Sequence, residues 1–133
     1  MSKTDNNYTH LAGEYFVAAE LSRHGCNIGI TIGNAKAIDI FAEIDGKPIN
    51  IQVKAIKNKK SIGFTISQTS DIKDYVLYIF ANLNDLESPD YYICYPYEVR
   101  EDFKQYKGRG IVNLYSLNAR LECKNNWASV LTY

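Results

Sequence analysis

The stretch IDIFAEIDGKPINIQVKAI, residues 38–56, decides the fold of this chain. It contains two runs that alternate apolar and polar residues, separated by the turn sequence Asp45-Gly46-Lys47-Pro48. Alternation with a period of two is typical of a β-strand that buries one face, and Asp-Gly favours a tight hairpin turn. We therefore predict that the two runs form an antiparallel β-hairpin.

The two faces of this hairpin differ in chemistry. The aliphatic face would carry Ile38, Ile40, Ala42 and Ile44 from the first run and Ile49, Ile51, Val53 and Ala55 from the second. The other face would carry Asp39, Gln52 and Lys54, and pairing of the runs lets Asp39 approach the other two. The pattern leaves two interpretations open. Asp39 and Lys54 form either an exposed ion pair, worth at most about 1 kcal/mol, or part of a functional site.

Residues 5–24 predict a helix, with Asp5 or Asn6 as its cap and Gly25 just after its last turn. At about 100° per residue, its apolar side chains fall on one broad arc, which we expect to face the core. The arc consists of Tyr8, Leu11, Ala12, Tyr15, Phe16, Ala18 and Ala19.

Glu14 falls inside that arc, between Leu21 and Ala18 on the helical wheel. A carboxylate turned toward the core is costly unless it is paired or bound to a cation. Glu14 therefore either extends to solvent from the edge of the arc, or faces the polar side of the hairpin and shares a site with Asp39 and Lys54.

The remaining elements follow from shorter patterns. Strands are predicted at residues 27–32, 63–67, 75–81 and 91–95, and helices at 97–106 and 127–131. This order predicts a mixed α/β fold with a central sheet flanked by helices. The 133 residues suffice for one domain, residues 1–133, with a single core.

Composition narrows the class of protein. Hydrophobic residues make up 46% and charged residues 23%, as in soluble globular proteins, and the formal net charge of zero argues against a general nucleic-acid coat protein. The N-terminus lacks the apolar stretch of a signal peptide, and the longest apolar run, residues 75–81, is too short to span a bilayer. We therefore expect a cytoplasmic protein.

Cysteine and histidine spacing gives no zinc motif. Cys26, Cys94 and Cys123 are widely spaced without a C-x-x-C pair, and His10 and His24 do not supply the spacing of zinc ligands. We expect reduced, mostly structural thiols.

The segments GEYFVAAELSRHG, GNAKAIDI and IQVKA occur in an order that resembles the PD-(D/E)xK nuclease superfamily, which has the restriction-endonuclease-like fold and includes Holliday-junction resolvases. Asp39 matches the motif aspartate, and Gln52-Val53-Lys54 matches the (D/E)xK part in the Q-x-K form of Mrr-like members. Glu14 matches the glutamate that many members carry on their first helix. The later YYICYPYEVR and NNWASVL resemble small bacterial domains of this superfamily with no assigned role.

The resemblance implies a Mg²⁺-dependent (or Mn²⁺-dependent) endonuclease, a hydrolase that cleaves phosphodiester bonds in DNA. It implies that Asp39, the side-chain oxygen of Gln52 and the backbone carbonyl of Val53 ligate the ion, and that Glu14 binds it directly or through a water. Lys54 would orient the attacking water and stabilise the charge that develops on the phosphate.

Two departures from the superfamily pattern affect these expectations. Ile38 stands where many members have proline, a position that varies across the superfamily. Gln52 replaces an acid, so the ligand set carries less negative charge and should bind Mg²⁺ more weakly. The alternative is therefore a catalytically inactive module that keeps the fold to bind nucleic acid or a protein partner.

Basic residues lie close to the motif in the sequence. Lys57, Lys59 and Lys60 follow Lys54, and Lys36 precedes Asp39. We expect these four lysines to contact the phosphates of nucleic acid, although a lysine-rich run is also typical of a solvated loop. The sequence leaves open a homodimer or a partner encoded by a neighbouring gene.

Overall fold

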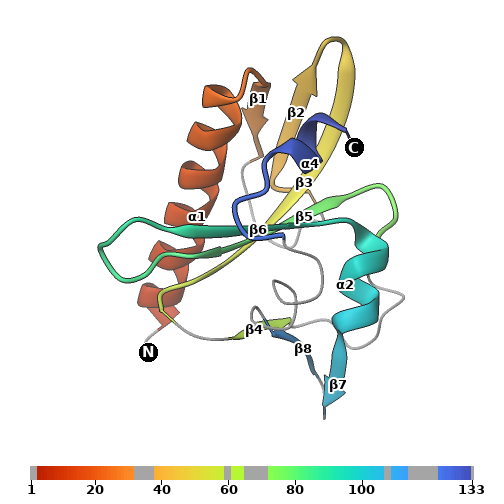
Figure 1. The fold of residues 1–133 in the computed structure, drawn as a ribbon. Helices are drawn as coiled ribbons and strands as arrows, with labels where there is room; N and C mark the ends of the chain where they lie inside the picture. The colour runs from red at the N-terminus through yellow and green to blue at the C-terminus, as the bar shows by residue number, and fades with distance from the viewer. Residues whose placement is uncertain are drawn as a thin grey trace.

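A computed structural model describes residues 3–31, 38–58, 61–64, 72–106, 109–113 and 123–132. Its centre is a five-stranded sheet with the strand order β1-β2-β3-β5-β6 (Figure 1). These strands are β1 (Asn27–Ile30), β2 (Ile40–Ile44), β3 (Lys47–Ile56), β5 (Leu77–Asn82) and β6 (Asp90–Cys94). Neighbours pair antiparallel except β3 and β5, which are parallel. The prediction of a mixed α/β fold with a central sheet is confirmed.

The hairpin of β2 and β3 forms as predicted. Ile44 pairs with Lys47, so Asp45 and Gly46 make a two-residue turn, and both have positive φ angles of 50° and 80°. Positive φ at both positions defines the turn that matches the right-handed twist of a hairpin, and Asp-Gly is one of the few sequences that adopt it readily. The aliphatic residues of β2 and β3 alternate to one buried face, but Ile38, predicted on the same face, packs with the buried residues of the other face.

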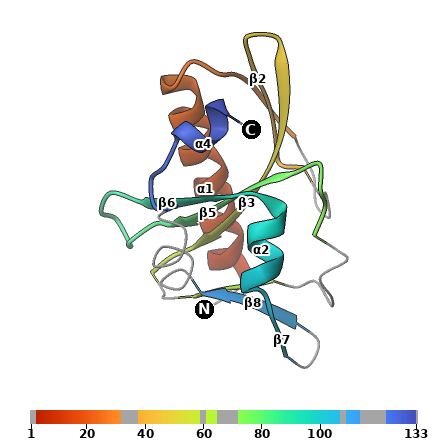
Figure 2. The same ribbon diagram turned by 45° about the vertical axis from the view of Figure 1, so that its right-hand side comes forward.

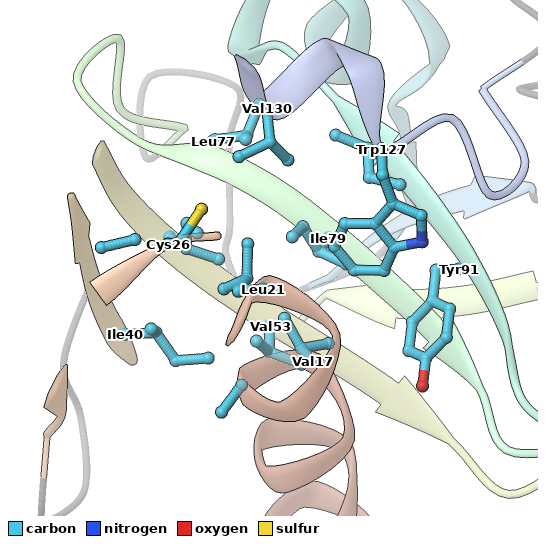
Figure 3. Close-up of a cluster of buried hydrophobic side chains, with 14 of the residues drawn as sticks. Val17, Leu21, Cys26, Ile40, Val53, Leu77, Ile79, Tyr91, Trp127 and Val130 are labelled. Carbon is cyan, nitrogen blue, oxygen red and sulfur yellow. The ribbon is translucent and has the colours of Figure 1, made fainter. Parts of the chain in front are cut away.

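Helix α1 (Lys3–Arg23) covers the aliphatic face of the sheet. Val17 and Leu21 of α1 project between Ile40, Val53, Leu77 and Ile79 of the strands (Figure 3). Trp127 and Val130, in and next to helix α4 (Ala128–Leu131), complete this cluster. The first core of the molecule therefore lies between α1, α4 and the sheet.

The other face of the sheet packs against a second set of elements. Helix α2 (Pro96–Asp102) and a three-stranded sheet of order β4-β8-β7 lie on the side of β5 and β6 away from α4 (Figure 1 and Figure 2). The strands of this sheet are β4 (Ser61–Phe64), β7 (Lys104–Tyr106) and β8 (Arg109–Asn113). Tyr78 and Phe80 of β5 pack with Val99 of α2 and Val112 of β8 in a second buried cluster.

The predicted helix 97–106 is too long. Helix α2 ends at Asp102, Phe103 is extended, and residues 104–106 form β7. The reason is tertiary pairing, because β7 pairs with β8 and gains a partner that local sequence does not reveal.

Two predictions about α1 are also wrong. The helix already includes Lys3, so Asp5 and Asn6 lie inside it and are not its cap. Most of the apolar arc faces outward, since Tyr8 is 67% exposed and Tyr15 is 57% exposed, whereas its member Ala18 is buried on the side that meets the sheet, together with Gly13 and Val17. Apolar and polar residues are not cleanly separated around the helix, so its sequence does not show which side meets the sheet. No helix within the described ranges is both long and apolar enough to cross a membrane.

Gly13 sets the distance between α1 and the sheet. A Cβ at this position would collide with the Cβ of Ala55 and lie 3.7 Å from Cγ1 of Val53. Two residues without bulk, one on the helix and one on β3, therefore allow the helix to approach the strand closely.

We predict that Gly13→Ala lowers the free energy of unfolding by about 1–3 kcal/mol. The added methyl group overpacks this contact, and the overpacking costs more free energy than the higher helix propensity of alanine contributes. Urea denaturation measures the change. The double variant Gly13→Ala/Ala55→Gly should recover part of the loss, since it removes the colliding atom. Equal stability of wild type and Gly13→Ala would contradict the close approach.

Candidate functional site

The candidate site lies where β2 and β3 separate. The last pair of the hairpin is Ile40 with Ile51, and just beyond it the Asp39 N–H donates to the Ile51 carbonyl at 2.8 Å. The next N–H on this edge of β3 belongs to Val53, and it donates to Oδ2 of Asp39 at 2.8 Å. The Asp39 carboxylate thus takes the place of a backbone carbonyl of the neighbouring strand, and the buried N–H of Val53 has an acceptor.

Glu14 reaches the same place from the helix. Its residue is 7% exposed and Asp39 is 5% exposed, so both carboxyl groups are withdrawn from bulk water. One carboxylate oxygen from each lies, together with a ring nitrogen of His10, within 4.8 Å of one another. Glu14 lies beside Asp39, as the second interpretation expects, but it comes from the aliphatic face of the sheet that α1 covers and not from the polar face of the hairpin that carries Lys54. The neighbouring Gly13 makes this approach possible, because it lets α1 lie close to β3.

Lys54 lies on the other face of the sheet and interacts with Asp39 through its charge. Val53 and Ala55 face α1, so the alternation of side chains places Lys54 on the opposite face. Burial lowers the pKa of the Lys54 ammonium, and the charge of Asp39 partly opposes this shift. Asp39 therefore lies between a carboxylate on one side and an ammonium on the other.

Gln52 and Val53 lie on the same strand as Lys54. Gln52 is half-buried and two residues from Lys54, which places the two side chains on one face, about 7 Å apart along the strand. The N–H and the carbonyl of a strand residue point to the same side, so the Val53 carbonyl faces the edge where Asp39 lies. The roles of these two residues as metal ligands stay predictions.

Sequence reasoning missed His10. Its Nε2 lies 3.7 Å from Oε2 of Glu14, and its side chain is 49% exposed, compared with 9% for that of Glu14. The spacing of four residues along a helix was the available signal, because residues i and i+4 share a helix face.

Of the four lysines predicted to contact nucleic acid, Lys57 lies within the described residues. Lys36, Lys59 and Lys60 lie outside the described residues. Lys57 is exposed and lines a groove of about 370 Å³ between α1 and the loop that follows β5. This groove also contains Ala12, Asp85 and Glu87. Glu14 is about 200° around the helix from Ala12, so Lys57 lies on the other flank of α1 from Glu14.

No family model matches the sequence, and no curated protein matches it. Two solved structures share the fold of this chain. The chain is similar to Hjc, a Holliday junction resolvase from Archaeoglobus fulgidus, with a TM-score of 0.59 and 10% identity over 83% of this chain and 88% of the other. It is also similar to the bacterial homing endonuclease I-Ssp6803I, with a TM-score of 0.58 and 13% identity over 86% of this chain and 76% of the other.

The chain has the restriction-endonuclease-like fold. One neighbour is a resolvase and the other is a homing endonuclease, and their identities of 10% and 13% to this chain show the fold alone. The fold predicted from the order of the motifs is therefore confirmed. The arrangement of two buried carboxylates beside an ammonium fits a divalent cation, because carboxylate oxygens are the hard ligands that Mg²⁺ and Mn²⁺ take.

Asp39 contributes to stability through the hydrogen bond that it accepts from Val53, and a conservative substitution can test this contribution apart from metal binding. We predict that Asp39→Ala lowers the free energy of unfolding by about 1–3 kcal/mol, because the buried Val53 N–H loses its acceptor. Asp39→Asn keeps a side-chain carbonyl and should lose less than about 1 kcal/mol. Chemical denaturation of both variants measures the difference. If the two substitutions cost the same, the hydrogen bond at 2.8 Å is not the reason.

Glu14 is expected to cost stability in the absence of a cation. We predict that Glu14→Gln unfolds at the same temperature as the wild type or higher, because one of two neighbouring buried carboxylates becomes neutral. Mg²⁺ or Mn²⁺ should raise the melting temperature of the wild type more than that of the variant, since a ligand that binds the folded state stabilises it. A large loss of stability with an unchanged response to the ion would identify Glu14 as a structural residue.

Proposed function

We propose that this chain is a Mg²⁺-dependent nuclease that hydrolyses phosphodiester bonds in DNA. The observation that carries the proposal is the approach of the two buried carboxyl groups of Glu14 and Asp39 beside the gap between β2 and β3, where the charge of Asp39 also acts on the ammonium of Lys54. The fold shared with a resolvase and a homing endonuclease supports it. Two buried carboxyl groups from a helix and a distant strand are costly to hold together without a cation.

The chain offers a ligand set for one divalent ion. Asp39 and Glu14 would hold it through carboxylate oxygens, and the Val53 carbonyl and the Gln52 side-chain oxygen would add neutral ligands. When bound, the ion supplies Lewis-acid polarisation of the phosphate. Asp39 keeps one oxygen on the Val53 N–H, so its second oxygen is directed by a fixed hydrogen bond.

Lys54 would act on the reacting groups from the other side of Asp39. An ammonium at this place can hold a water molecule for attack and stabilise the negative charge that grows on the phosphate. Its charge counts for more there than at the surface, because the side chain is partly withdrawn from water. The attraction of Asp39 keeps the ammonium at the site.

Two residues at the border of the site are exposed to solvent. His10 is about half exposed and lies beside the buried Glu14, and Phe41 on β2 is 51% exposed. The carboxyl groups of the site are therefore buried, and its border is exposed to solvent. A DNA substrate is proposed because the fold is similar to that of the two nucleases. Lys57 lines a groove on the other flank of α1, so it would contact DNA away from the bond that is cleaved.

Gln52 supports a second candidate function, a binding module without catalysis. A neutral amide where an acid is usual in the motif weakens the attraction for a cation. Such a module would keep the fold and bind nucleic acid or a protein partner. Cleavage measured with matched variants separates the two functions.

We predict that the purified protein nicks supercoiled plasmid DNA in the presence of Mg²⁺ or Mn²⁺ and not in the presence of a chelator. Lys54→Ala and Asp39→Asn should each lower the rate by about 10²-fold or more, the usual cost of removing a group that stabilises the transition state. Gel electrophoresis of nicked and linear products gives the rate.

Lys47→Ala is the matched control, because Lys47 is an exposed lysine on the same strand at the far end of the hairpin. Its rate should equal that of the wild type. Equal trace cleavage by the wild type, Lys54→Ala and Asp39→Asn would indicate a contaminating nuclease and would remove the catalytic function in favour of the binding module.

A further inference from the structure

We propose that His10 is a third side-chain ligand of the ion held by Glu14 and Asp39, and that its imidazole shifts the preference of the site from Mg²⁺ toward first-row transition-metal ions. This inference rests on the proposed function. It concerns a residue that the motif does not contain and that the sequence alone did not single out.

The geometry of the three side chains points to a shared ion. The ring nitrogen of His10 and the carboxylate oxygens of Glu14 and Asp39 lie within 4.8 Å of one another. The distance of 3.7 Å between Nε2 of His10 and Oε2 of Glu14 is longer than a hydrogen bond. Two ligands of one octahedral ion, each about 2.1 Å from it, are separated by about 3–4 Å.

A simple helix-surface ion pair explains these positions less well. Pairs of residues i and i+4 on a helix are usually both exposed and worth only about 0.2–0.5 kcal/mol. Here Glu14 is almost fully buried and directed at a second buried carboxylate, while His10 stands at the solvent border of the same group. The imidazole therefore lies at the solvent border of the carboxylate pair, where an ion from solution would enter.

The chemistry of imidazole then sets the choice of ion. Mg²⁺ takes hard oxygen ligands, whereas an aromatic nitrogen suits the later ions of the first transition row. With Gln52 in place of an acid, the oxygen set is poorer in charge than the usual motif, and a nitrogen ligand compensates most for ions that bind nitrogen well. An amide at position 52 and a histidine at position 10 thus favour the same group of ions.

Metal binding without turnover tests this inference. Co²⁺ is titrated into the wild type and followed by its visible absorption, and Mg²⁺ is titrated by calorimetry. We expect His10→Ala to weaken Co²⁺ binding at least tenfold and to change Mg²⁺ binding less than twofold. The Co²⁺ absorption of the variant should also shift toward that of an all-oxygen site. Alanine is the best helix former, and His10 is half exposed, so the variant should fold normally.

His24→Ala is the matched control, because His24 is the other histidine of the chain and stacks on Trp127 away from the site. It should bind both ions as the wild type does. Asp39→Asn should weaken both ions and so tests the ion site itself.

Each outcome decides one question. If His10→Ala binds Co²⁺ as tightly as the wild type while Asp39→Asn weakens both ions, His10 is not a ligand and the proposed metal-dependent nuclease stands. If Asp39→Asn leaves both affinities unchanged, or if the wild type binds neither ion, the metal site fails and this inference fails with it. A tenfold loss confined to Co²⁺ in His10→Ala supports the inference.

Discussion

The hydrogen bond from the Val53 N–H to the Asp39 carboxylate holds the candidate site together. It forms just beyond the last residue pair of β2 and β3, where the Asp39 side chain accepts the hydrogen bond that a backbone carbonyl of β2 would otherwise accept. The bond fixes one carboxylate oxygen, orients the other and satisfies a buried amide at the same time. Structure and chemistry thus depend on the same group at this point of the sheet.

The second requirement is the closeness of α1 to β3. Gly13 and Ala55 together leave no side-chain bulk between the helix and the strand, and the next residue of the helix, Glu14, is thereby brought to Asp39. Lys54 lies on the opposite face because side chains alternate along β3, and its ammonium feels the charge of Asp39. The gap in the sheet places Asp39 where it interacts with groups on both faces.

Much of this arrangement was predictable from residues 38–56, because a period of two and an Asp-Gly turn specify a hairpin by local chemistry. Glu14 was also predictable, since an acid among apolar helix residues has few stable environments. The outward face of α1 was not, because tyrosines and alanines surround the helix and only the position of the sheet decides which are buried. The pairing of β7 with β8 and the placement of His10 beside Asp39 likewise depend on contacts between distant segments.

The parallel pairing of β3 with β5 has a consequence for biosynthesis. The core that seats α1 includes Leu77 and Ile79 of β5, which are made after every residue of the candidate site. A nascent chain that ends before β5 has Glu14, Asp39 and Lys54 in its sequence without the framework that gathers them. We therefore expect the candidate site to assemble only after Asn82, the last residue of β5, has left the ribosome.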